Sequence, residues 1–190
     1  MPRIPLPELS ELSAPVSEAL SVMPPQGTIF RMVAHAETAF SPFLQLAGVI
    51  QTGLSLDPVL RQIAILRVSV IARCPYETVQ QEVVSKIEGV PEAKVRALVE
   101  GRIDGAGFTD RELLLLRFVD EVIEQRGAGE ATTAAMAAIF SPREIVEILL
   151  VVWQYFGIAM LINTTGLETQ PPIDAEAILK ARARRAALLG

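Results

Sequence analysis

One short stretch, residues 61–82, holds most of the side chains of this sequence that could do chemistry. It contains the only cysteine of the chain, Cys74, followed directly by Pro75. Proline is favoured at the first position of a helix, so we expect Cys74 to cap a helix that begins at Pro75. A helix N-terminus and an adjacent cation, here Arg73, both lower the pKa of a thiol. Cys74 is therefore a candidate catalytic nucleophile.

Glu77 and Tyr76, in the first turn of the same expected helix, are candidates for catalytic proton transfer. A carboxyl group or a phenol can act as an acid or a base when its surroundings adjust its pKa. Glu77 would oppose ionisation of Cys74, because a nearby carboxylate disfavours a thiolate. Two simpler interpretations stay open. Glu77 could be an exposed carboxylate favoured by the helix dipole, and Cys74 a small buried apolar side chain.

Gln62, Gln81 and the single histidine, His35, are candidates for binding rather than for covalent chemistry. A glutamine amide is neither a useful acid nor a useful base, but it can hold a ligand by hydrogen bonds. His35 could line a site or shuttle a proton, and it could equally bond a backbone carbonyl at a helix end. One histidine and one cysteine cannot form a His/Cys metal cluster, so we expect no metal and no other cofactor.

The spacing of these candidates limits how they can meet. Gln62 precedes Cys74 by about 18 Å along a continuous helix, and Gln81 follows it by about 10 Å. A simple helical hairpin therefore does not bring all three residues together. Either the first helix breaks early, or a neighbouring subunit completes the site.

Length and composition indicate one ordinary domain or a compact repeat of two units, and they argue against nucleic-acid binding. The 190 residues are 51% hydrophobic and 5% aromatic, with a formal net charge of −5. No basic stripe with interleaved aromatic residues is present, so nucleic-acid binding is not expected. A mean hydropathy of +0.38 is high, and it suggests that the chain also buries a face against copies of itself. A single cysteine and the lack of an apolar leader fit a cytoplasmic protein.

Helical periodicity and capping residues predict an all-α fold, and no convincing strand pattern is present. Residues 1–27 are expected to form a proline-rich arm with a short helix near 17–23, residues 28–169 a helical domain, and residues 170–190 a hinge and C-terminal helix. Capping residues and terminating glycines mark where the helices are expected to begin and end. The caps are serine–proline and aspartate–proline pairs and a threonine. The predicted helices cover residues 28–39, 42–51, 58–73, 75–88, 91–100, 110–125, 130–140, 142–163 and the chain from 174 onward.

The apolar run 145–162 is almost long enough to span a membrane. Glu147 and Gln154 interrupt the run and no basic flank follows, so we expect a buried helix and no membrane partner. Its large side chains are expected in the core or at an interface, and a ligand pocket lined by them is the alternative. They are Trp153, Tyr155, Phe156 and Met160.

Several pieces of the sequence, in order and spacing, resemble the carboxymuconolactone decarboxylase family, which includes the alkylhydroperoxidase D-like proteins. The pieces are 30–35, 56–58, 61–68, 74–77, 89–90 and Tyr155, and they cover about three quarters of the chain. The resemblance implies a compact all-α fold, a homotrimer or homohexamer, a small-molecule substrate or ligand, and a site at the N-terminus of the Cys74 helix.

Peroxidases of this family share a motif of a glutamate, then a Cys-x-x-Cys pair, then a histidine four residues after the second cysteine. Carried over to this chain, those positions are Gln62, Cys74, Glu77 and Gln81, so one of the four residues is kept. The two-cysteine peroxidase cycle is excluded unless another molecule supplies a thiol, because Cys74 has no partner in its chain. The decarboxylase-like relatives often keep the glutamate and the histidine, and both of those positions are glutamine here.

Three functions consequently stay open. The first is a thiol-dependent peroxidase, an antioxidant oxidoreductase that works through Cys74 alone. The second is a non-catalytic relative that binds a small ligand. The third is a lactone decarboxylase or isomerase with different acid and base groups, for which Glu77 is the first candidate.

Overall fold

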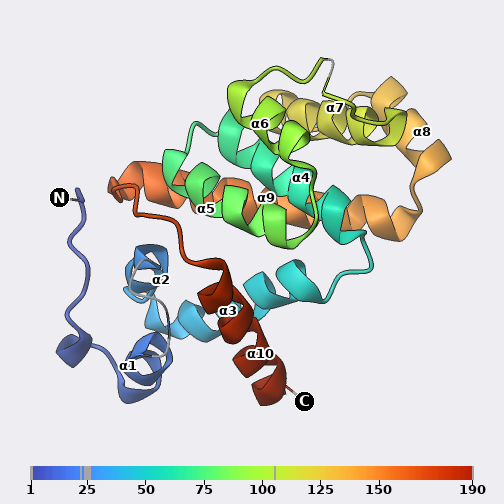
Figure 1. Cartoon of the computed structure of the whole chain (residues 1–190). Coiled ribbons are helices and arrows are strands. Elements are labelled where there is room, and N and C mark those ends of the chain that lie inside the picture. Colours follow the sequence, from blue (N-terminus) through green and yellow to red (C-terminus); the bar gives the residue numbers. More distant parts are fainter. Residues whose placement is uncertain (1, 22, 24–26, 105, 190) are drawn as a thin grey trace.

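The computed structural model describes residues 2–21, 23, 27–104 and 106–189, with side chains to residue 183. Its regular elements are all helical and no strand occurs within these ranges, which confirms the all-α prediction. Figure 1 shows their arrangement. The elements are η1 (Leu9–Glu11), α1 (Ala14–Ser21), α2 (Thr28–Val33), α3 (Glu37–Thr52), α4 (Pro58–Ile71), α5 (Pro75–Ile87), α6 (Glu92–Glu100), α7 (Asp110–Gln125), α8 (Glu130–Ile139), α9 (Pro142–Thr165) and α10 (Ala175–Leu189).

Helix α4 lies at the centre of the fold and packs against α5, α6, α7 and α9 (Figure 1). Its start is fixed as expected, because the Asp57 carboxylate accepts hydrogen bonds from the backbone N–H groups of Val59 and Leu60, at 2.9 and 3.0 Å. Most of the helix is apolar on every side, and Ile63 and Leu66 are fully buried. The polar residues Arg61, Gln62 and Ser69 are buried with them, so this core helix carries polar groups into the interior.

Helix α9 is long and apolar enough to cross a membrane, as is often true of a core helix in a soluble protein. Here it packs against α3, α4, α7 and α8, and Ile148 and Val151 on that side are fully buried. Its other side stays open. The expected buried helix is thus buried on one face, and the exposed face carries the apolar side chains Val146, Leu149, Leu150, Trp153 and Met160.

The N-terminal helices build a second, smaller apolar core, which they share with the start of α5 and the end of α9. The helices predicted over 28–39 and from residue 42 are wrong in their boundaries. The first ends at Val33, and α3 already begins at Glu37 with Pro42 inside it. The Glu37 carboxylate accepts a hydrogen bond from the backbone N–H of Ser13 at 2.9 Å, so a contact with the distant arm positions the start of α3.

In the arm itself, α1 (Ala14–Ser21) begins three residues before the short helix expected near 17–23, and residue 22 lies outside the described part. The C-terminal segment crosses α5. The Gln80 side chain holds it on both sides, since it donates to the carbonyl of Pro171 at 3.1 Å and accepts from the N–H of Ile173 at 2.9 Å. Helix α10 then packs against α5.

Candidate functional site

The turn between α4 and α5 places Cys74 at the N-cap of α5, as predicted. Arg73 before it has a φ of 50°, a left-handed conformation that is uncommon for a residue with a side chain. The Cys74 side chain is buried and makes no cap hydrogen bond. Burial raises the pKa of the thiol to about 11, and the Glu77 carboxylate adds to the rise. The expected lowering of this pKa by the helix end and Arg73 is therefore outweighed, and Cys74 is a thiol at neutral pH.

Glu77 is the most unusual group in this region. Its side chain is buried, although the sequence alone left an exposed first-turn carboxylate open. Among the described residues it has no cationic partner, and the amide of Gln81 is its hydrogen-bond donor, at 3.5 Å from Oε2. Burial raises the pKa of Glu77 to about 7, and the Gln81 hydrogen bond only partly opposes that rise. Glu77 can therefore both hold and release a proton near neutral pH.

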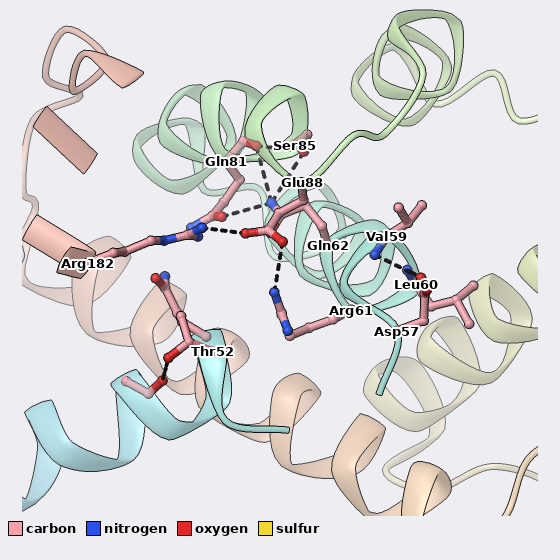
Figure 2. A network of polar contacts seen from close by, with 12 residues as sticks. Thr52, Asp57, Val59, Leu60, Arg61, Gln62, Gln81, Ser85, Glu88 and Arg182 are labelled. Carbon is pink, nitrogen blue, oxygen red and sulfur yellow. Dashed lines mark hydrogen bonds and ion pairs between the residues drawn. The ribbon is translucent and has the colours of Figure 1, made fainter. Parts of the chain in front are cut away.

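Gln62 and Gln81 meet across the α4–α5 hairpin (Figure 2). The Gln62 Nε2 group donates to Gln81 Oε1 at 3.0 Å and lies 3.3 Å from the hydroxyl of Ser85. Because Gln81 accepts through its oxygen, its own nitrogen is left to donate toward Glu77. Helix α4 runs unbroken from Pro58 to Ile71, so the expected early break of the first helix is wrong. Gln62 instead meets Gln81, which contacts Glu77 and Ser85 at steps of four residues along α5.

Two buried tyrosines lie within electrostatic reach of the Glu77 carboxyl group. The Tyr76 hydroxyl accepts hydrogen bonds from the Thr28 hydroxyl at 3.2 Å and from the Ile29 N–H at 3.4 Å. The Tyr155 hydroxyl accepts from the Gln51 side chain at 2.9 Å. Burial raises the pKa of each phenol, and the negative charge of Glu77 raises both further. Both tyrosines are therefore neutral hydrogen-bonding groups at neutral pH.

A charged cluster joins α4, the end of α5 and the C-terminal helix. The Glu88 carboxylate lies between two guanidinium groups, with Arg61 at 3.1 Å and Arg182 at 2.6 Å (Figure 2). Both arginines lower the pKa of Tyr155 by their charge, which places them within electrostatic reach of that phenol. Two cations share one carboxylate here, so the cluster has a net positive charge.

His35 contacts the N-terminal arm. It is exposed, and its Nε2 lies 2.8 Å from the carbonyl oxygen of Pro5 in the N-terminal arm. This contact matches the alternative in which His35 bonds a backbone carbonyl. No cluster of three or more histidine, cysteine or acidic residues that could hold a metal occurs in the part of the chain that the structure describes.

The sequence interpretation did not include Ser85, Arg61, Glu88, Arg182 or Tyr155 in the site. Ser85 could have been found, because it continues the four-residue spacing of Glu77 and Gln81. The ion pairs with Glu88 join positions 27 and 94 residues apart, and no local pattern indicates them.

Comparison with known proteins supports the fold. No protein-family model matches the chain, and no curated protein sequence matches it. Among solved structures, an uncharacterised peroxidase-related protein of Ralstonia eutropha, described as an alkylhydroperoxidase AhpD core, has a TM-score of 0.74 at 19% identity, over 94% of this chain and 95% of that one. A peroxidase-related protein of a Silicibacter species has a TM-score of 0.75 at 17% identity, over 89% and 92%.

A third structure, a protein of unknown function from Agrobacterium tumefaciens assigned to antioxidant defence as an AhpD, has a TM-score of 0.64 at 20% identity, over 75% of this chain and 96% of that one. These likenesses show that the chain has the alkylhydroperoxidase D-like fold. The resemblance noted from the sequence is thereby confirmed at the level of the fold.

Proposed function

We propose that this protein is an enzyme that acts on a small molecule by proton transfer through Glu77, as a lactone decarboxylase or isomerase does. The observation that carries the proposal is a buried carboxyl group with a pKa of about 7 and no cationic partner among the described residues. Burying such a group costs stability, and groups of this kind cluster at functional sites. A catalytic acid or base also works best when its pKa lies near the operating pH.

The surrounding residues suit a carbonyl substrate that becomes more negative as it reacts. In a decarboxylation, the bond to the leaving carboxylate breaks and its electron pair moves into the system conjugated with the lactone carbonyl. Protonated Glu77 then delivers its proton to carbon and is reprotonated from water. Gln81 holds the Glu77 carboxyl in place through the Gln62 contact. The positive charge shared by Arg61 and Arg182 would favour an acidic substrate.

The test is a panel of unsaturated lactone carboxylic acids, with carbon dioxide release and ultraviolet absorbance as readouts. Glu77→Gln keeps the shape of the side chain and removes its proton, so we expect at least a 100-fold loss of kcat. Glu82→Gln is the matched control, since Glu82 lies on the same helix and is only partly buried. Equal rates for the wild type and Glu77→Gln, or no turnover of any compound, would reject the proposal.

A second candidate, a thiol-dependent peroxidase that uses Cys74 alone, is favoured by the peroxidase-related names of the structural neighbours. The thiolate would attack the hydroperoxide, release an alcohol and become a sulfenic acid, which an added thiol would reduce through a mixed disulfide. The raised pKa of Cys74 predicts slow attack at neutral pH. Hydroperoxide consumption with dithiothreitol, lost in Cys74→Ser and retained in Glu77→Gln, would favour this candidate over the first.

A further inference from the structure

Helix α10 is packed differently from the other helices of the fold. Each of α1 to α9 buries at least two residues, whereas the described side chains of α10, which run to residue 183, are all exposed or partly exposed. Neither apolar core of the described structure includes a residue between 168 and 183. Most helices are stabilised mainly by burying an apolar face. The described part of α10 therefore depends on other contacts.

Polar contacts with α5 hold α10 and the segment before it in place. The Gln80 side chain bonds the backbone of Pro171 and Ile173, and Arg182 Nη1 lies 2.6 Å from Glu88 Oε1. Water can replace each partner when such a contact breaks, so a neutral hydrogen bond adds little net stability and a charged one somewhat more. The described contacts consequently hold α10 less firmly than apolar burial holds the core helices.

The Arg182 contact leads directly to a buried ion pair. Glu88 lies between the guanidinium groups of Arg61, from α4, and Arg182, from α10 (Figure 2). The Arg61 side chain is 5% exposed and the Glu88 side chain 9%, but that of Arg182 is 21% exposed. If α10 leaves, Glu88 keeps Arg61 as its partner. Release of α10 therefore leaves no buried charge unpaired, a cost that would otherwise oppose it strongly.

We infer that α10 is a detachable lid, whose release from α5 opens the Arg61–Glu88 pair to solvent and to small polar solutes. Release requires the contacts of Arg182 and Gln80 to break, and the non-helical residues 167–174 can act as the hinge. A free helix of 15 residues is only marginally stable in water, so the released α10 unfolds. The inference goes beyond the proposed function and does not depend on the role of Glu77.

Hydrogen exchange of the full chain, followed by mass spectrometry, measures release of the lid. We expect amides of α10 to be protected, but to exchange at least about 100-fold faster than those of α4, because they open locally. Arg182→Gln should speed exchange in α10 at least tenfold, the effect of one charged hydrogen bond, and leave α4 unchanged. Gln80→Leu is a second variant and should act in the same direction. Lys180→Gln is the matched control, since Lys180 pairs with Glu176 on the exposed side of the same helix.

Chemical modification of arginine measures what the lid covers. Phenylglyoxal reacts with accessible guanidinium groups, and tandem mass spectrometry locates the modified positions. We expect Arg61 to react at least tenfold faster in Arg182→Gln than in the wild type. Arg67 is the internal control, because it lies on the same helix and is paired with Asp120 of α7 at 2.7 Å. Its rate should be the same in both proteins.

Three results would overturn the inference. The first is exchange in α10 as slow as in α4, which would make α10 part of the cooperative core, or exchange without any protection, which would mean that it is not docked. The second is an equal change of α10 exchange in Arg182→Gln and Lys180→Gln. The third is equal modification of Arg61 in the wild type and Arg182→Gln, because the lid would then not cover that residue.

Discussion

Two buried glutamates of this protein, Glu77 and Glu147, have nearly the same exposure and opposite electrostatic behaviour. They are 6% and 7% exposed. Burial alone would raise the pKa of Glu147, but hydrogen bonds from the amides of Ser55 and Leu56, at 3.1 and 2.7 Å, and from Arg143 hold it below the usual value. Glu77 has the weak contact with Gln81 instead, and its pKa rises to about 7.

The difference shows that the donors around a buried carboxyl group decide its role. Glu147 lies beside the loop that precedes α4, where backbone N–H groups have no helical partners, and it satisfies two of them. That arrangement stabilises the fold and fixes the ionised state. Glu77 satisfies no backbone group of another element in the described structure, so the fold gains little from its charge. Proton transfer near neutral pH requires a carboxyl group with few hydrogen-bond donors around it, as at Glu77.

The largest effect is expected from removing the structural glutamate. Glu147→Ala leaves the Ser55 and Leu56 amides without an acceptor in a buried region, and we expect a loss of about 3 kcal/mol in the free energy of unfolding. Urea denaturation at pH 7 measures it. Glu124→Ala, at an exposed position of α7, is the control and should change the stability by less than about 0.5 kcal/mol. A small loss for Glu147→Ala would contradict the assigned role.

The second prediction concerns the pH dependence that Glu77 confers. Its pKa rises from the usual 4.5 to about 7 on folding, so the folded protein keeps a proton that the unfolded chain has released between these values. The stability from this group is therefore present below pH 4.5 and is lost as the pH rises to about 7. The loss amounts to about 3 kcal/mol.

Glu77→Gln removes this dependence, because an amide does not titrate. We expect the free energy of unfolding of the variant, relative to the wild type, to increase by about 3 kcal/mol between pH 4.5 and pH 8. Urea denaturation of both proteins at the two pH values provides the measurement. Glu147 should contribute with the opposite sign, since its lowered pKa makes the protein less stable as the pH falls through it. A difference that does not change with pH would show that Glu77 ionises normally.

The smallest effect is expected from Gln81→Leu. The Gln81 amide is the group that partly opposes the rise of the Glu77 pKa, and its contact is long at 3.5 Å. Without it the pKa of Glu77 should rise further, by an amount that carbon-13 NMR of the labelled carboxyl group can follow in a pH titration. Ser85→Ala, which leaves Gln81 in place, should shift this pKa less. A fall of the pKa in Gln81→Leu would mean that the amide disfavours the carboxylate.

Most helices of the fold could be predicted from local signals. Thr109 caps α7 and Ser141 caps α9, each with a glutamate three residues on that bonds back to the cap, and both helix starts agree with the prediction. The start of α3 could not be predicted in this way. The Ser41–Pro42 pair resembles a helix start, but the contact between Glu37 and Ser13 extends α3 past it.

The sequence predicted several residues of α5 that belong to the candidate site. It did not predict their burial or the direction of their pKa shifts. The spacing of Glu77 and Gln81 placed them on one face, and the contact of Gln81 with Gln62 across the hairpin was not predicted. The burial of Glu77 depends on packing against other elements, which no spacing along α5 indicates. For the same reason the expected activation of Cys74 by its helix was outweighed by burial, and its pKa rises.

The contacts that anchor the C-terminal segment also affect the order in which parts of the protein fold. Gln80 forms hydrogen bonds with Pro171 and Ile173, and Glu88 forms an ion pair with Arg182. These residues of α5 therefore bind partners that lie about 90 residues later in the sequence. During synthesis on a ribosome, α4 and α5 emerge and can pair long before α10 exists. The contacts of Gln80 and Glu88 with the C-terminal segment therefore form late in folding, after α4 and α5 have paired.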